Sequence, residues 1–305
     1  VAILFVSHRL EEVFAIANRL TVFRDGGHII TAPVSEMTTE EIIKHMVGRE
    51  LSNLFPKGEA EIGEVVLEVR HLTRPGVFAD VNFQLRRGEI LGFAGLVGAG
   101  RTEVARALFG IDRVESGETW LKGKKVHIRS PQQAMANGIA YVPEDRHQQG
   151  LVMNFSIASN ITLPILQQVS RLGLVDSRRE QQIAGDYSSQ LRVRSTGVEQ
   201  LVKALSGGNQ QKVVLGKWLA TNPSVLILDE PTRGIDVGAK AEVHRIISDL
   251  AAGGLAIILI SSELPEVLAM ADRVIVLHEG RVTGTFSRSE ATSERVMFAA
   301  TGQDR

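Results

Sequence analysis

The 305-residue sequence has no cysteine, almost no net charge and no long hydrophobic run. The absence of cysteine excludes disulfide bonds and thiolate metal sites, and it is typical of a reducing compartment. The formal net charge of −1 does not favour a nucleic-acid-binding protein. The longest apolar stretches, such as residues 255–260 (LAIILI), have the length of a buried strand and are far shorter than a membrane span.

The first residues, VAILFVSH, also lack the features of a signal peptide. They include no methionine, no charged n-region and no small-residue cleavage site. The apolar pattern predicts instead a chain that begins inside a β-strand.

Residues 204–236 hold two motifs that suit nucleotide chemistry. The turn at residues 206–208 (SGG) is predicted to open a helix, whose unpaired backbone N–H groups and positive dipole end suit an anion. The apolar strand SVLIL then ends in Asp229 and Glu230, which places two carboxylates at the carboxyl edge of a parallel sheet. The first motif suits a phosphate, and the second suits Mg²⁺ and a water molecule.

An internal repeat indicates how the chain is organised. Residues 1–49 align without gaps with residues 255–303, and both copies show the same strand–helix–strand pattern. The chain is therefore expected to start in the last quarter of one domain and to contain most or all of a second. We expect the first domain at residues 1–50, a linker rich in Pro, Gly and charge at residues 51–63, and the second domain at residues 64–305.

The second domain alternates predicted strands with helices, which favours a mostly parallel sheet covered on both faces. A polar, Gln-rich stretch at about residues 151–205 is expected to form a separate helical lobe. The predicted strands are residues 64–70, 79–85, 90–94, 138–142, 224–228, 255–260 and 273–277, and the predicted helices include residues 239–252 and 264–271.

A glycine-rich loop, GLVGAGRT, follows the third of these strands. It places Gly95, Gly98, Gly100 and Thr102 where a P-loop has them. The glycines let backbone N–H groups approach phosphate oxygens, and Thr102 would supply a hydroxyl to Mg²⁺. Arg101 stands at the lysine position, and its planar guanidinium does not act as a point charge between two phosphates. The loop is therefore expected to bind nucleotide more readily than to support fast hydrolysis.

Together these motifs resemble those of the ATP-binding-cassette (ABC) ATPases. LSGGNQQK at residues 205–212 resembles their signature motif, SVLILDEPTRGID resembles their Walker B motif and D-loop, and RHQQGLV after YVPED lies where their glutamine loop enters the helical lobe. The resemblance is closer still to the tandem two-cassette ATPases of bacterial monosaccharide importers, such as those for ribose, galactose, arabinose and autoinducer-2. It implies an α/β fold: a P-loop NTPase (RecA-like) core with a mostly parallel sheet, an antiparallel β subdomain and a helical signature subdomain.

The resemblance also implies the roles of individual residues. Glu230 would be the general base, His8 the switch histidine of the first cassette, and Thr102 and Asp229 the residues that hold Mg²⁺. The residues that it implies for ATP are Gly95, Gly98, Ala99, Gly100, Arg101, Thr102, Glu144, Ser206, Gly207, Gly208, Asn209 and Ser262.

Departures from the family pattern gather in the site of the second cassette. Arg101 replaces the lysine, Glu144 stands at the place of the loop glutamine, and Ser262 stands where the repeat places His8. Phe78 is the candidate for the aromatic residue that stacks on adenine. Three departures in one site predict functional asymmetry: this site would bind MgATP and hydrolyse it slowly or not at all.

The resemblance further implies partners and a location. ABC cassettes pair head to tail, so residues 206–209 would complete the site of an ATP held by a first cassette that is mostly missing here; pairing with a second copy of this chain as a homodimer is the other arrangement. An integral membrane permease would receive the motion of the helical lobe, and a periplasmic sugar-binding protein would act indirectly. The chain would lie peripherally on the cytoplasmic face of the inner (plasma) membrane, with no nucleic-acid partner.

Two other functions share these motifs. One is a soluble ABC ATPase of translation or DNA repair, which the lack of a basic run in the linker and of sustained heptads in the helical lobe disfavours. The other is a regulatory module that binds nucleotide without hydrolysing it. A nucleotide-binding titration beside an ATPase assay would distinguish the regulatory module from an ATPase.

Overall fold

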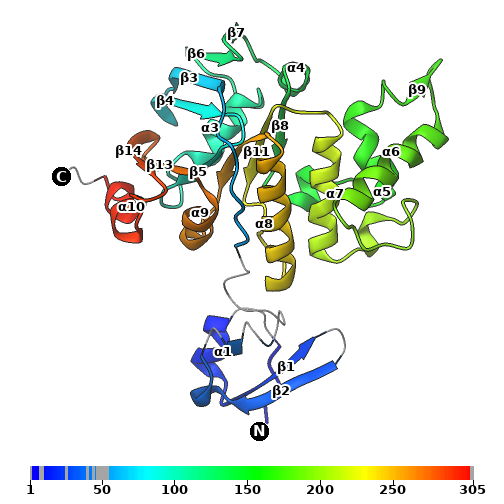
Figure 1. Ribbon diagram of the computed structural model, residues 1–305, viewed down its shortest axis with the longest axis vertical. Helices are drawn as coiled ribbons and strands as arrows, with labels where there is room; N and C mark the ends of the chain where they lie inside the picture. The colour runs from blue at the N-terminus through cyan, green and yellow to red at the C-terminus, as the bar shows by residue number, and fades with distance from the viewer. Residues whose placement is uncertain are drawn as a thin grey trace.

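The computed structural model describes residues 2–6, 10–24, 27–38, 41–42, 45 and 55–302 of the chain (Figure 1). In the N-terminal part, helix α1 (Leu10–Ile16) precedes the antiparallel strands β1 (Arg19–Arg24) and β2 (Gly27–Pro33) and the 3-10 turn η1 (Val34–Glu36). These elements share a small cluster of buried side chains, Leu20, Val22, Val34 and Ile42.

The N-terminal elements have counterparts of the same length near the C-terminus. Helix α9 (Leu264–Met270) and strands β13 (Arg273–His278) and β14 (Arg281–Ser287) follow one another in the order of α1, β1 and β2. They occupy the positions that the sequence repeat assigns to them. The two segments therefore share secondary structure as well as sequence pattern.

The strand expected at the start of the chain is not present. Residues 2–6 have no regular secondary structure, and their apolar side chains are exposed. Their counterpart in the repeat, β12 (Ala256–Ile260), is hydrogen-bonded on both sides, to β5 (Ile90–Ala94) and β11 (Val225–Asp229). A strand needs such neighbours for its backbone groups, and residues 2–6 pair with no strand in the described part of the chain. The prediction of a chain that begins inside a strand is wrong for these residues.

A six-stranded sheet forms the centre of the part described by residues 55–302. Its strands lie in the order β14, β13, β5, β12, β11 and β8 (Ile139–Val142), and all neighbours are parallel except β13 and β14. Every residue of β5, β11 and β12 is buried, which explains why these segments are continuous apolar runs in the sequence. The carboxyl ends of β5, β12 and β11 therefore meet at one edge of the sheet.

A second sheet is antiparallel, and a shared hydrophobic core joins it to the central sheet. Phe83 and Phe93 show the contact directly, since their rings meet edge to face with centroids 5.3 Å apart. Helices α3 (Arg101–Leu108) and α4 (Pro131–Ala136) contribute to the same core. The strands of the second sheet lie in the order β4 (Phe78–Arg86), β3 (Val65–Arg74), β6 (Ser116–Leu121) and β7 (Lys124–Val126).

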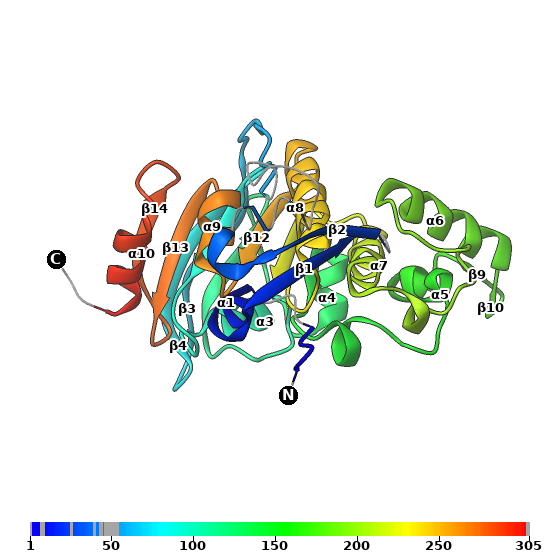
Figure 2. The ribbon, with the colours of Figure 1, turned by 90° about the horizontal axis from the view of Figure 1, so that it is seen from below.

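Helices cover the remaining surfaces of the central sheet. Helix α10 (Ser293–Ala300) lies at the β14 edge, and the helical lobe extends from the opposite side (Figure 2). Helix α8 (Val237–Ala252) packs with the lobe and the sheet in a second core cluster. The lobe consists of η3 (Arg146–Gly150), α5 (Ile157–Thr162), η4 (Leu163–Ile165), β9 (Ser170–Arg171), β10 (Leu174–Val175), α6 (Ser177–Gln190), η5 (Val202–Ala204) and α7 (Gly207–Leu219).

Most predicted elements agree with the observed ones to within a few residues. Helix α8 begins two residues earlier than predicted because Asp236 caps it, accepting a hydrogen bond from the Ala239 N–H at 2.9 Å. The hairpin of β9 and β10 inside the helical lobe was not predicted. None of the helices in the described residues is both long and apolar enough to cross a lipid bilayer.

Residues 55–63, the described part of the expected linker, run along the surface of the second part. The Phe55 ring lies against the His244 ring of α8, with centroids 5.0 Å apart. Lys57 pairs with Asp272 at 2.8 Å. Residues 51–54 of the expected linker lie outside the described residues. The described residues of this segment are thus attached by side-chain contacts to α8 and to the turn before β13.

Candidate functional site

The glycine-rich loop joins β5 to α3 at the carboxyl edge of the central sheet. Gly95, Gly98 and Gly100 have φ angles of 151°, 82° and 97°, which residues with a side chain rarely adopt. A Cβ on Gly95 would lie 2.4 Å from the Leu277 carbonyl oxygen. Gly100, the N-cap of α3, offers no side-chain hydrogen bond, so the first backbone N–H groups of the helix suit an anion.

Arg101, at the predicted lysine position, is turned into the fold. It is 8% exposed, and its Nη1 donates a hydrogen bond to the Ser261 carbonyl oxygen at 2.7 Å. Burial lowers the pKa of Arg101, while the charges of Glu230 and Asp229 offset part of that effect. The guanidinium is therefore held just beyond the end of β12 and is not extended as the point charge that a P-loop lysine supplies.

Asp229, the last residue of β11, is fully buried beside the loop. It accepts hydrogen bonds from the Thr102 hydroxyl at 3.2 Å and from the Tyr141 hydroxyl at 2.9 Å. Burial raises the pKa of Asp229, and the two hydrogen bonds offset part of the rise. A hydroxyl and a carboxylate held side by side are oxygen ligands of the kind that Mg²⁺ takes together with phosphates and water. Thr102 and Asp229 therefore fit the predicted metal role.

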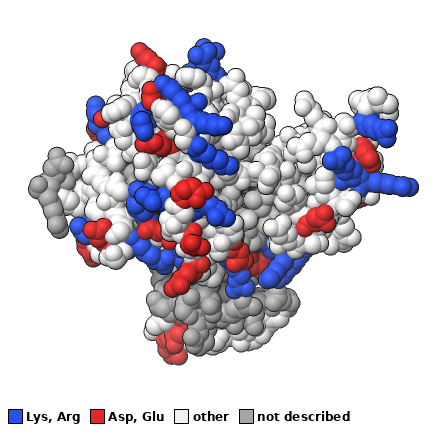
Figure 3. All heavy atoms as spheres, turned by 45° about the horizontal axis from the view of Figure 1, so that its top comes forward, with Lys and Arg blue, Asp and Glu red and all other residues white. Residues whose placement is uncertain are grey.

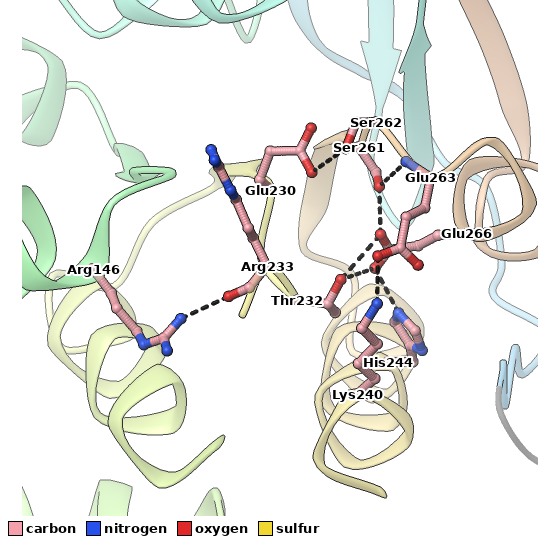
Figure 4. Close-up of polar contacts among 10 residues, drawn as sticks. All are labelled: Arg146, Glu230, Thr232, Arg233, Lys240, His244, Ser261, Ser262, Glu263 and Glu266. Atoms are coloured by element: carbon pink, nitrogen blue, oxygen red, sulfur yellow. Dashed lines mark hydrogen bonds and ion pairs between the residues drawn. The ribbon is translucent and has the colours of Figure 1, made fainter. Parts of the chain in front are cut away.

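Glu230 follows β11 in a strained backbone turn. Its φ of 49° is unusual for a residue with a Cβ, and such a conformation costs roughly 1–3 kcal/mol. The Ser262 hydroxyl donates a hydrogen bond to Glu230 Oε2 at 3.1 Å (Figure 4). Burial raises the pKa of Glu230, and the hydrogen bonds from Ser262 oppose the rise. A raised pKa brings the carboxylate nearer to the range in which a general base works at neutral pH.

Glu144 forms an ion pair with Arg233, which lies between Glu230 and α8. Arg146 holds the same segment: its Nη1 and Nη2 donate to the carbonyl oxygens of Arg233 and Gly234 at 2.7 and 3.0 Å. Because Arg146 is the first residue of η3, the entrance of the helical lobe is tied to the segment that follows Glu230.

An open cavity of about 440 Å³ lies between the glycine-rich loop and the segments after β8, β11 and β12. It brings together loop residues 98–102 with Glu144, Glu230 and Ser262, which the sequence predicts in one site, whereas the predicted Gly95 and Asp229 do not line it. Its lining residues are Val97, Gly98, Ala99, Gly100, Arg101, Thr102, Glu103, Glu144, Glu230, Arg233 and Ser262.

The predicted signature residues do not line this cavity. Ser206 is the N-cap of α7, and its hydroxyl oxygen accepts a hydrogen bond from the Asn209 side chain at 2.9 Å rather than from a backbone N–H. A Cβ on Gly208 would lie 2.5 Å from Ala239 Cβ, so glycine is needed for α7 to pack on α8. The first N–H groups of α7 lie at a place apart from the P-loop, and their binding of an anion stays a prediction.

The two remaining predicted residues are His8 and Phe78. His8 lies outside the described residues. Phe78 is 2% exposed and packs in the core between the two sheets. A ring buried in this way has no face for a nucleotide base, so the prediction that Phe78 stacks on adenine is wrong.

Three site residues were not predicted: Tyr141, Arg146 and Arg233. Tyr141 reaches Asp229 because β8 and β11 are neighbours in the sheet. The sequence places Tyr141 near the end of a predicted strand, in the segment YVPED. This position would have indicated a contact with Asp229 only if the order of the strands had been known. The contacts of Arg146 and Arg233 join segments that are far apart in the sequence, and no local pattern indicates them.

A P-loop between a strand and a helix, with two carboxylates at the end of a nearby parallel strand, defines a P-loop nucleotide-binding protein. The family model described as "ABC transporter" matches residues 78–233. Together with the relatives below, this match shows that the chain belongs to the ABC transporter ATPase family.

The relatives are similar along the whole chain. "Ribose import ATP-binding protein RbsA 2" of Streptomyces avermitilis is 59% identical over 302 residues, which cover 99% of this chain and 60% of that protein. "Ribose import ATP-binding protein RbsA" of Bacillus subtilis is 49% identical over 302 residues, covering 99% of this chain and 61% of that protein. The chain thus spans about 60% of the length of the curated relatives that it matches.

Solved structures show the same fold at low sequence identity. An ATP-binding cassette of an ABC transporter in its ADP conformation has a TM-score of 0.66 at 18% identity, covering 79% of this chain and 100% of that one. The cbiO1 protein of Clostridium perfringens, part of the ABC transporter complex cbiONQ, has a TM-score of 0.65 at 21% identity, covering 77% and 93%. The predicted P-loop NTPase fold, with its parallel sheet, antiparallel β subdomain and helical subdomain, is confirmed.

Proposed function

We propose that this chain is the second cassette, with the end of the first, of an ATP-binding subunit that energises import of a monosaccharide through a membrane permease. The observation that carries the ATPase part is the cavity lined by the P-loop with Thr102 and by Glu230, with Asp229 buried behind Thr102 and hydrogen-bonded to it. The sugar part rests on the names of the relatives, which are ribose import proteins at 49–59% identity.

The residues in and beside the cavity would have three different roles. The loop N–H groups and the N-terminus of α3 would bind the phosphates of ATP, and Thr102 and Asp229 would hold Mg²⁺, which shields phosphate charge when bound. Glu230 would orient a water molecule and accept its proton. Ser262 donates to Glu230 and would position that carboxylate, although its single hydroxyl cannot replace the two ring nitrogens of a histidine.

We further propose that this site hydrolyses ATP slowly. Arg101 is bonded to the Ser261 carbonyl, and Glu144 is paired with Arg233. Both groups would have to leave these partners before they could act on a nucleotide. Ser206, Gly207, Gly208 and Asn209 would instead face an ATP held by a first cassette, whose His8 would serve that faster site.

The proposed membrane partner is a permease contacted by the helical lobe. Residues 155–166, which contain α5 and η4, bury Ile157, Ile161 and Ile165 in the lobe but leave Phe155 and Leu166 more than 40% exposed. Exposed apolar side chains of this kind suit a contact with a partner. The chain would then lie at the cytoplasmic face of the membrane, and a periplasmic sugar-binding protein would act through the permease.

A non-hydrolysing regulatory module is the second candidate, and the buried bond between Arg101 and Ser261 favours it. A role on nucleic acid has less support. On the face drawn in Figure 3, Lys and Arg side chains are interspersed with Asp and Glu, in line with the formal net charge of −1. The assay that separates ATPase from regulator is binding of a non-hydrolysable ATP analogue measured beside phosphate release; hydrolysis by the isolated chain at the rate of a complete transporter ATPase would contradict the slow-site proposal.

An Arg101→Lys variant is expected to raise phosphate release by about tenfold, because lysine is a compact point charge that can reach the β- and γ-phosphates. Nucleotide affinity should change little, since the charge is kept. Arg106→Lys in the same helix is the matched control, because Arg106 pairs with Asp112 away from the cavity. Equal rates for wild type and Arg101→Lys would show that Arg101 does not limit turnover.

Glu230→Gln, made in the complete two-cassette protein, is expected to reduce sugar transport much less than loss of the corresponding base of the first cassette. The reason is that the proposed fast site belongs to the first cassette. Uptake of radiolabelled ribose into cells or proteoliposomes measures both effects. Equal losses from the two substitutions would contradict the proposed asymmetry.

A further inference from the structure

A buried polar cluster lies beside the segments that follow β11 and β12 at the carboxyl edge of the central sheet (Figure 4). Its residues do not line the cavity described above. Its centre is Glu266 of α9, which is 1% exposed. The Glu266 carboxylate accepts hydrogen bonds from the Ser261 hydroxyl at 2.5 Å, from His244 Nε2 at 2.6 Å and from the Thr232 hydroxyl at 3.0 Å. Although burial by itself would raise the pKa of Glu266, the hydrogen bonds from His244, Ser261 and Thr232 lower it and so favour the charged form.

On one side the cluster contacts two segments that lie next to Glu230, the segment after β11 and the segment after β12. Thr232 follows Glu230 by two residues, and Ser261 directly precedes Ser262, whose hydroxyl bonds to Glu230. The Ser261 hydroxyl also accepts a hydrogen bond from the Glu263 N–H at 3.0 Å. Glu266 therefore joins the segment after β11 to the segment after β12, and Glu230 depends on both for its position.

On the other side the cluster reaches the linker. His244 is 1% exposed, and its ring lies against Phe55. One turn further along α8, the Ser248 hydroxyl accepts a hydrogen bond from the Gly58 N–H at 2.8 Å. The linker thus contacts His244 directly, and His244 is hydrogen-bonded to Glu266.

A carboxylate with almost no access to water depends on each of its donors, because the loss of one leaves part of its charge without compensation. Movement of His244 by the linker would therefore force Glu266, Ser261 and Thr232 to readjust together. We propose that His244 and Glu266 are positioning residues that couple the linker at Phe55 to the placement of Glu230. This inference rests on the proposed role of Glu230 in hydrolysis.

The test compares three variants of the 305-residue chain. His244→Phe keeps the ring against Phe55 but loses the donor, whereas His244→Gln keeps an N–H near the place of Nε2. His278→Phe is the control, since His278 is half-buried, bonds to the Ala300 carbonyl and does not contact the cluster. Thermal unfolding of each variant establishes that it is folded.

Single-turnover hydrolysis of radiolabelled ATP, with the chain in excess, gives the maximal rate and the half-saturating concentration even for a slow site. His244→Phe is expected to lower the maximal rate about tenfold, with less than about a twofold change in half-saturation, because a hydrogen bond to a buried charge is lost away from the nucleotide. His244→Gln should keep the rate within about twofold of wild type. Equal rates for folded His244→Phe and wild type, or equal losses in the Phe and Gln variants, would overturn the inference.

The experiments also distinguish failure of the proposed coupling from failure of the proposed role of Glu230. If the wild-type chain hydrolyses no ATP, or if Glu230→Gln hydrolyses as fast as wild type, the role of Glu230 is wrong. The positioning is then decided by deuterium uptake at the amides of residues 230–236 and 260–264. Faster uptake in His244→Phe, restored in His244→Gln, supports the coupling, and uptake equal to that of wild type in both variants overturns it.

Discussion

An Asp229→Asn variant is expected to lose about a hundredfold in Mg²⁺-dependent affinity for ATP, which corresponds to about 2.7 kcal/mol. The carboxylate is the charged member of the Thr102–Asp229 pair, and an amide supplies a much weaker oxygen ligand to a divalent cation. Affinity in the presence of excess EDTA should change little, since the loop N–H groups remain. Titration of a fluorescent ATP analogue with and without Mg²⁺ measures the difference.

The control for Asp229→Asn is Asp249→Asn, which makes the same change at an exposed position of α8. It should leave both affinities unchanged.

The gain in ATP affinity that Mg²⁺ gives the wild-type chain should also decrease as the pH is lowered. Because burial raises the pKa of Asp229, the carboxylate takes up its proton at a higher pH than an exposed aspartate does. Mg²⁺-dependent binding that is equal in Asp229→Asn and wild type would remove Asp229 from the metal site.

Gly95→Ala is expected to cost about 3 kcal/mol of the free energy of unfolding, a combination of backbone strain and a steric clash. The residue has a φ of 151°, and its new Cβ would lie 2.4 Å from the Leu277 carbonyl oxygen and 2.9 Å from Ala99 Cβ. The carbonyl belongs to a strand that is paired on both sides, so it cannot move away easily. Urea-induced unfolding followed by circular dichroism gives the change.

Gly98→Ala provides a matched comparison in the same loop. Gly98 also has a positive φ, of 82°, but a Cβ at this position would have no described atom within 4 Å beyond its chain neighbours. Only the conformational cost of about 1 kcal/mol remains. If the two alanine variants were equally stable, the close approach of Leu277 to the loop would not be what requires glycine at position 95.

The candidate nucleotide site was largely predictable because its motifs are local. The glycine loop, the Asp229–Glu230 pair and the Ser206–Gly208 turn are short segments in which residue type and spacing report directly on backbone conformation. Glu144 and Ser262 were predicted by comparison with the family and with the repeat, and both line the cavity. The fold class followed from the alternation of strands and helices.

The parts that were missed depend on contacts across long distances in the sequence. Residues 2–6 have the apolar pattern of a strand, but they form none because the described residues provide no neighbouring strand for them. Phe78 is aromatic at a plausible position, but its burial excludes a role in stacking. An apolar pattern shows that a segment can be buried, and only the packing decides what covers it.

The sequence by itself determined that this chain belongs to the ABC transporter ATPase family and carries a signature motif and a phosphate loop with arginine at the lysine position, since each of these is a matter of residue type at fixed spacing. Only the tertiary structure decided where the altered residues point. It turned Arg101 toward the Ser261 carbonyl, paired Glu144 with Arg233, and buried Glu266 between the linker and the carboxyl edge of the central sheet. Such contacts arise when strands and helices distant in the chain pack against one another, and their distances and burial cannot be derived from local pattern.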